Sequence, residues 1–146
     1  MKIAIACDHG GYELKEMIAG MLDGLDIRVV DVGPEKLDPD DDYPEYGFRC
    51  GEVVAAGEVD GGIVVCGSGI GISIAANKVK GVRCALCTSR EMAELARRHN
   101  DANMIALGGR TTDPVTAMGI VETWLNTEFE GGRHQRRVDK LNHYGD

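Results

Sequence analysis

The sequence predicts a three-layer α/β/α fold in which a five-stranded parallel sheet lies between two layers of helices. Short apolar runs alternate with longer segments of helical periodicity along the chain. The apolar runs are nearly uninterrupted, as expected when helices cover both faces of each strand. Most of the 20 glycines flank these runs, where tight strand-to-helix turns occur. Residues 1–146 are therefore expected to form a single Rossmann-like domain.

The expected elements alternate from the start of the chain. The first strand is the apolar run 2–7, and a helix over 11–22 follows the first glycine turn. The same pattern predicts further strands over 27–32, 61–66, 82–87 and 103–107. Helices are expected over 45–56, 70–79, 89–99, 114–126 and, with most of the concentrated positive charge, about 133–142. Three prolines and four aspartates make residues 33–44 a surface loop.

Composition excludes several classes of partner. The net charge of −8 argues against binding to nucleic acid, because a phosphate backbone needs a basic face. No apolar run approaches the roughly 20 residues that span a bilayer, and residues 2–6 are too short for a signal peptide. The five cysteines are an odd number and do not suggest a disulfide framework. A reducing compartment is expected, and the predicted location is cytoplasmic.

The most informative segment is 61–77. A predicted strand ends at Cys66, and three glycines follow at alternate positions: Gly67, Gly69 and Gly71. Because this turn lacks bulky side chains, its backbone N–H groups can approach an anion closely. Open α/β sheets bind ligands at the carboxyl ends of their strands, and a thiol beside helix-terminal amides can act as a base or nucleophile. The alternative is that the glycines only allow a helix to pack closely on its strand.

This turn departs from the nucleotide-binding fingerprints. Ile72 occupies the place of the third glycine of the dinucleotide pattern, and the turn follows the third strand rather than the first. The Gly-Lys-Ser/Thr ending of a Walker A loop is also absent. The turn is therefore expected to bind an anion without specificity for a nucleotide. A non-catalytic module that binds a nucleotide or another phosphate ligand is kept as an alternative.

Two other segments offer acid–base groups. Asp8 and His9 follow the first strand, and they share a crevice with Cys66 if the first and third strands are neighbours. The alternative is that Asp8 caps a helix and His9 is merely exposed. His99 lies near the end of a predicted helix, where it is either a functional group or a favourable partner of the helix dipole.

Two pairs of like residues have close spacing. Arg133 and Arg137 are i, i+4 neighbours on one helix face, and paired guanidinium groups suit a phosphate. The alternative is a solvated basic face that pairs with the acidic loop. Cys84 and Cys87 have the spacing of a redox motif, but on a strand their side chains face opposite sides. Buried core cysteines are the expected reading, and no second Cys/His pair supports a zinc site.

Taken together, these stretches resemble the sugar-phosphate isomerase family of ribose-5-phosphate isomerase B and the galactose-6-phosphate isomerase subunits. The matching stretches are Cys-Asp-His-Gly-Gly-Tyr at 7–12, Asp-Tyr-Pro at 42–44, Gly-Ser-Gly-Ile-Gly-Ile-Ser-Ile-Ala-Ala-Asn-Lys at 67–78, Arg-His-Asn-Asp-Ala-Asn at 98–103 and Glu-Gly-Gly-Arg-His-Gln-Arg-Arg-Val at 130–138. The similarity is collinear and runs the whole length of the chain.

The resemblance implies an aldose–ketose isomerase that works through a cis-enediolate, with no metal and no cofactor. Cys66 matches the base that moves a proton between adjacent sugar carbons. Ser68 matches a position that hydrogen-bonds the reacting oxygens, and the amides of residues 67–71 match the cradle of the enediolate. His99, aided by Asp8, matches the residue that opens the sugar ring.

The resemblance also implies how substrate and subunits come together. The phosphate-binding positions are matched by His9, Arg133 and Arg137, with Arg110 as an addition. Two further residues match substrate-contacting positions: Tyr43 and Asn100. The family site is built between two subunits, so that His99 serves the Cys66 of a neighbour. A homodimer is therefore expected, and such dimers could pair into tetramers.

The expected reaction is the interconversion of ribose 5-phosphate and ribulose 5-phosphate. One branch of the family has a glutamate where this chain has Ile72 and lacks the cysteine, so Cys66 favours the cysteine-base branch. An isomerase of a six-carbon sugar phosphate, such as allose or galactose 6-phosphate, is the nearest alternative. A thiol-redox role through Cys84 and Cys87 is a more distant one.

Overall fold

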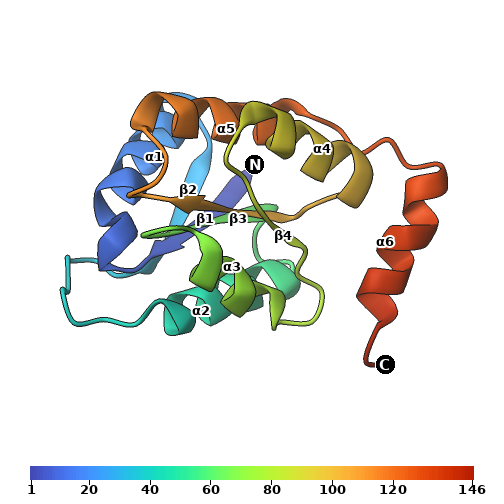
Figure 1. Ribbon diagram of the computed structural model, residues 1–146, viewed down its shortest axis with the longest axis horizontal. Coiled ribbons are helices and arrows are strands. Elements are labelled where there is room, and N and C mark those ends of the chain that lie inside the picture. Colours follow the sequence, from blue (N-terminus) through green and yellow to red (C-terminus); the bar gives the residue numbers. More distant parts are fainter.

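A five-stranded parallel sheet forms the middle layer of the protein, as seen in a computed structural model of residues 1–146 (Figure 1). The strands are β1 (Lys2–Cys7), β2 (Arg28–Gly33), β3 (Gly61–Cys66), β4 (Cys84–Leu86) and β5 (Met104–Gly108). Their order across the sheet is β2-β1-β3-β5-β4, and every neighbouring pair is parallel. The predicted α/β fold class is confirmed, and β1 does lie beside β3.

Helices cover both faces of the sheet (Figure 1). One layer holds α1 (Tyr12–Gly24), α4 (Arg90–Asn100) and α5 (Pro114–Asn126), and the other holds α2 (Tyr43–Ala55) and α3 (Ile70–Asn77). A short 3-10 helix, η1 (His9–Gly11), leads from β1 into α1. No helix of the chain is both long and apolar enough to cross a membrane.

The core is divided by the sheet, because successive side chains of a strand point to opposite faces. On β1, Ile3 and Ile5 belong to the cluster beneath α1 and α5, whereas Ala4 and Ala6 belong to the cluster beneath α2 and α3. All four side chains are almost fully buried. This two-sided burial is the physical reason for the uninterrupted apolar runs in the sequence.

The last helix, α6 (Arg133–His143), packs against α4 and projects from the side of the molecule opposite α1 (Figure 1). Only two of its residues are buried, His134 and Val138. The guanidinium group of Arg83 donates to Asn142 Oδ1 at 2.7 Å, which ties the far end of α6 to the segment before β4. Most of the surface of α6 is therefore polar and solvated.

Two predicted boundaries were wrong at this edge of the sheet. The strand expected over 82–87 is limited to β4, because the amide of Arg83 donates to the Asn103 side chain instead of joining the sheet. The helix expected over 70–79 ends at Asn77, whose side chain exchanges two hydrogen bonds with the backbone of Cys84. Side-chain hydrogen bonds thus replace regular structure on both sides of the α3–β4 connection.

The cysteines are all free. Cys84 and Cys87 pack into the clusters on opposite faces of the sheet, as predicted from their spacing. Burial raises the pKa of Cys87 to about 11 and also raises the pKa of Cys84. Such thiols are poor redox groups, because the thiolate is the reactive form.

The close packing of the start of α1 on β3 predicts how two glycine substitutions change the free energy of unfolding. A Cβ atom on Gly11, which immediately precedes α1, would lie 2.5 Å from the Val65 carbonyl oxygen, whereas one on Gly20, within α1, would meet nothing. Gly11→Ala should lower the free energy of unfolding by about 1–3 kcal/mol through this overlap. Gly20→Ala should raise it by roughly 0.5–1 kcal/mol, because alanine favours the helix. Urea unfolding measures both variants, and equal midpoints would contradict the close packing of α1 on β3.

Candidate active site

Three strand-to-helix turns meet at the carboxyl edge of the sheet. The amide of Asp8, after β1, donates to the Val65 carbonyl at 3.2 Å, and the amide of Gly109, after β5, donates to the Cys66 carbonyl at 2.8 Å. A Cβ atom on Gly10 would lie 2.9 Å from the Gly67 nitrogen, and one on Gly109 would lie 2.5 Å from the Gly10 carbonyl oxygen. The turns after β1, β3 and β5 are therefore in direct backbone contact, which only glycine permits.

An open cleft of about 690 Å³ lies over these turns. Its lining includes seven of the residues singled out from the sequence: Asp8, Tyr43, Cys66, Gly67, Ser68, Gly71 and Arg110. Gly69 supports the cleft from beneath. Its φ is +79°, and a Cβ atom there would lie 2.7 Å from Leu86 Cδ1. A tight turn, rather than helix packing alone, explains why the segment is rich in glycine.

Cys66 is held by the backbone of its own turn. The amide of Gly69, the residue that precedes α3, donates to Cys66 Sγ at 3.1 Å. The next turn amide, from Ile70, donates to Ser68 Oγ at 3.2 Å. Unpaired amides and the positive end of the helix dipole favour negative charge at this point. The arrangement can therefore stabilise a thiolate or an oxyanion in the cleft.

Asp8 combines the two roles that the sequence left open. Its Oδ1 accepts from the amide of Gly10 at 2.8 Å, so it caps η1 as the structural alternative predicted. The same carboxylate also lines the cleft that contains Cys66. His9 is half-exposed at the rim, and its Nδ1 lies 2.8 Å from Oδ1 of Asp41. This hydrogen bond is the largest cause that raises the pKa of His9 above 6.5.

The sequence alone does not single out Asp41 as a candidate site residue. It is one of four aspartates in the loop before α2, and nothing in their spacing distinguishes it. In the structure its side chain is buried against His9, although the two residues are 32 positions apart. A contact between a loop and a distant turn leaves no periodic signal in a single sequence.

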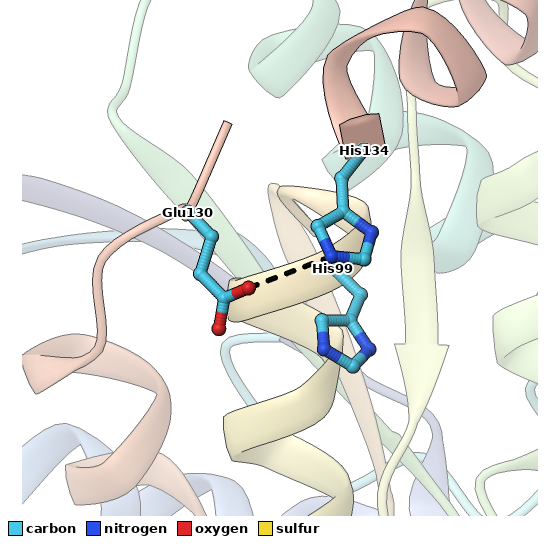
Figure 2. Close-up of side chains that lie close together, drawn as sticks. All are labelled: His99, Glu130 and His134. Atoms are coloured by element: carbon cyan, nitrogen blue, oxygen red, sulfur yellow. Dashed lines mark ion pairs between the residues drawn. The ribbon is translucent and has the colours of Figure 1, made fainter. Parts of the chain in front are cut away.

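His99 lies elsewhere, in a cluster with Glu130 and His134 (Figure 2). The rings of His99 and His134 are stacked with centroids 4.3 Å apart and planes 13° apart. His134 Nε2 lies 3.5 Å from a Glu130 carboxylate oxygen. Burial has the largest effect on the pKa of His134 and lowers it below 6.5, and the nearby His99 acts in the same direction. A neutral His134 can stack on His99 without charge repulsion.

This cluster joins the end of α4 to the start of α6, far from the carboxyl ends of the strands (Figure 1). Six predicted site residues do not line the cleft around Cys66. His9 and Gly69 belong to the turns that carry Asp8 and Cys66, whereas the other four come from α4 and α6: His99, Asn100, Arg133 and Arg137. The two arginines are exposed and form no ion pair within the chain, so they do not pair with the acidic loop. The structure thus separates the predicted site into two halves.

Two groups of side chains have the composition of metal ligands. In His99, Glu130 and His134 the donor atoms lie within 4.8 Å of one another. A metal lies in the plane of each imidazole that binds it, so the stacked rings cannot share one ion unless one of them turns. In the group formed by Asp8, His9 and Asp41, the Nδ1 of His9 is already hydrogen-bonded to Asp41. Neither group is arranged as a formed metal centre.

The fold and the cleft define an α/β protein that offers a thiol and an anion cradle at the carboxyl edge of a parallel sheet. Residues 3–141 match the family model described as Ribose/Galactose Isomerase. The chain belongs to this family, as its sequence motifs indicated.

Individual relatives are similar over nearly their whole length. Ribose-5-phosphate isomerase B of Escherichia coli is 46% identical over 96% of this chain and 93% of its own. The structure of the Clostridium thermocellum ribose-5-phosphate isomerase B has a TM-score of 0.95 at 51% identity, over 97% and 95% of the two chains. The Mycoplasma genitalium enzyme, solved with bound ribulose-5-phosphate, has a TM-score of 0.95 at 44% identity, over 98% and 95%.

Proposed function

We propose that this protein is an aldose–ketose isomerase that interconverts ribose 5-phosphate and ribulose 5-phosphate through a cis-enediolate. The observation that carries the proposal is the Cys66 thiol, which lines an open cleft and accepts a hydrogen bond from the Gly69 amide. Family membership and the names of the similar enzymes support the same reaction.

Cys66 serves as the base in this proposal. Its thiolate removes the proton from C2 of the open-chain aldose, and the electron pair of the C–H bond forms the enediolate. The resulting thiol then returns a proton to C1, which yields the ketose without any change in overall oxidation state. Positioned acid–base groups of this kind typically contribute about 10²–10⁴-fold to the rate.

The glycine turn stabilises the charge that develops on oxygen. Backbone amides of residues 67–71 are fixed before the reaction begins, and fixed donors lose no energy in reorienting. The Ser68 hydroxyl is placed between this turn and the cleft, where it can hydrogen-bond the two reacting oxygens and pass a proton between them. Tyr43 and Arg110 also line the cleft and are proposed to contact the sugar and its phosphate.

The second half of the site is proposed to come from another copy of the chain. His99, which would open the sugar ring with the help of Asp8, lies away from Cys66 together with Asn100, Arg133 and Arg137. The cleft is open, and Ile70 and Ile74 at its edge are exposed apolar side chains. A second copy that covers them would add His99 as an acid–base group and the arginines as phosphate ligands. The protein would then act as a homodimer.

The reaction itself is tested by the rate at which ribose 5-phosphate yields a ketose phosphate in the presence of a chelator. Turnover should persist with the chelator, and it should exceed turnover of allose 6-phosphate and galactose 6-phosphate. Faster turnover of a six-carbon substrate would show that this sugar phosphate, rather than ribose 5-phosphate, is the preferred substrate. An absence of turnover with all three would contradict it.

The role of Cys66 is tested by Cys66→Ala with Cys84→Ala as the matched control. Loss of the base should lower kcat by about 10²–10⁴-fold while ribose 5-phosphate still binds. Cys84 lies outside the cleft, so its replacement should leave kcat within about twofold of the wild type. Steady-state kinetics and calorimetric binding measure these effects. A Cys66→Ala enzyme that retains full activity would refute the mechanism.

The shared site is tested by mixing two inactive variants. When Cys66→Ala and His99→Gln chains are unfolded together and refolded, half of the dimers should be mixed, and each mixed dimer should contain one intact site. About a quarter of the wild-type activity should return. Cys66→Ala mixed with Ser68→Ala is the control, because both changes affect the same half of the site and no intact site can form. Equal recovery in the two mixtures would exclude a site shared between subunits.

A further inference from the structure

The loop between β2 and α2 places one buried carboxylate against His9. Oδ1 of Asp41 accepts from the His9 backbone amide at 3.0 Å and lies 2.8 Å from the His9 Nδ1. The Asp41 side chain is 5% exposed, whereas the His9 side chain is 33% exposed. The other carboxylate oxygen, Oδ2, is buried and accepts no hydrogen bond of good geometry, although the Tyr46 hydroxyl lies near enough for Asp41 to raise the pKa of Tyr46. This pair therefore has one buried anionic member and one that reaches the surface.

The hydrogen-bond pattern fixes the chemistry of the ring. An ionised carboxylate can only accept, so Nδ1 of His9 must be the donor. Nε2 has no partner within the chain, and it is an acceptor in the neutral ring but a donor in the imidazolium. A buried carboxylate with one unpartnered oxygen is costly unless a cation lies beside it. The position of Asp41 therefore favours the imidazolium form, in which both nitrogens of His9 donate.

Three charged groups face His9. Asp41 comes from the loop before α2, Asp8 from the turn after β1, and Arg110 from the turn after β5. The hydrogen bond with Asp41 has the largest effect on the His9 pKa and raises it, and the Asp8 charge acts in the same direction. Partial burial and the Arg110 charge lower it, but the net change is upward. In its imidazolium form, His9 thus presents a second positive charge near Arg110.

The loop that carries Asp41 is anchored to the helix that follows His9. Lys15, a fully buried residue of α1, donates to both carboxylate oxygens of Asp31 at 3.0 Å and to the Pro34 carbonyl at 2.8 Å. The Tyr12 hydroxyl donates to the Glu35 carbonyl at 3.0 Å. These bonds hold the start of the loop relative to η1 and α1. The contact between Asp41 and His9 is therefore built into the fold.

We propose that Asp41 is a positioning residue of the phosphate subsite: it holds His9 through Nδ1 and presents the Nε2–H of a cationic ring to the substrate phosphate beside Arg110. This inference rests on the proposed function, because it takes a sugar phosphate as the ligand of His9. Asp41 acts through His9 and does not touch the substrate. A charge-assisted hydrogen bond to phosphate is roughly twice as strong as a neutral one.

Asp41→Asn tests this role, with Asp40→Asn as the matched control. Both variants remove one negative charge from the same loop, but the side chain of Asp40 makes no hydrogen bond or ion pair. The pKa of His9, followed by NMR and assigned with His9→Gln, should fall in Asp41→Asn and stay unchanged in Asp40→Asn. The KM for ribose 5-phosphate above pH 7 should rise about tenfold in Asp41→Asn only, with kcat within about twofold.

A double variant separates positioning from a general effect on the fold. In a His9→Gln background, Asp41→Asn should raise KM no further, because the ring through which it acts is gone. An additional rise of similar size would show that Asp41 acts independently of His9 and would overturn the proposal. An unchanged His9 pKa in a folded Asp41→Asn protein would also overturn it.

Two measurements keep this inference distinct from the proposed function. If the wild-type protein fails to turn over ribose 5-phosphate, inorganic phosphate becomes the probe. Weaker phosphate binding and a lower His9 pKa in Asp41→Asn would then still support the pair as an anion site. If Asp41→Asn does not fold, the pKa of His9 is measured by NMR in the wild-type protein instead. The proposal requires this pKa to lie above 6.5, and a value at or below 6.5 would overturn it.

Discussion

The close approach of three backbone turns at the carboxyl edge of the sheet is the constraint on which the site depends. Gly10 touches Gly67, and Gly109 touches Gly10, at distances that no side chain would allow. Because β3 lies between β1 and β5, the turns that carry Asp8, Cys66 and Arg110 are brought to one place. The sheet order places these turns side by side beneath the cleft, and the glycines let their backbones pack in contact. A Cβ atom in this contact would push the turns that carry Asp8 and Arg110 away from the turn that carries Cys66.

The second consequence is that the groups assigned to the proposed reaction lie in two separate parts of the chain. The thiol, the amide cradle and the His9–Asp41 pair belong to the carboxyl edge of the sheet. The stacked histidines lie where the end of α4 meets the start of α6 (Figures 1 and 2), and Arg133 and Arg137 belong to α6. Proton transfer and ring opening would then be assigned to different subunits. In the proposed dimer, such a division would make assembly a requirement for activity, because the half with Cys66 lacks the ring-opening histidine and the half with His99 lacks the thiol.

Much of the fold was predictable because burial leaves a periodic signal. Strands covered on both faces are continuous in apolar residues, and the turn that follows Cys66 is marked by its alternating glycines. The shortening of β4 was not predictable, because it depends on a hydrogen bond from the Arg83 amide to the Asn103 side chain, which replaces a hydrogen bond within the sheet. Asp41 could not be chosen among four aspartates for the same reason: its importance lies in a contact with a residue 32 positions away. The stacking of His134 on His99 is likewise a contact between distant segments.

Solvent deuterium exchange tests the central claim most directly, which is that the thiol fixed by the glycine turn moves a proton between two sugar carbons. In D₂O, the wild-type protein should place deuterium at C2 of recovered ribose 5-phosphate and at C1 of the ketose, as read by NMR. Cys66→Ala, folded and able to bind the substrate, should place none over the same time. Undiminished deuterium exchange, or undiminished isomerisation, by folded Cys66→Ala would contradict the claim.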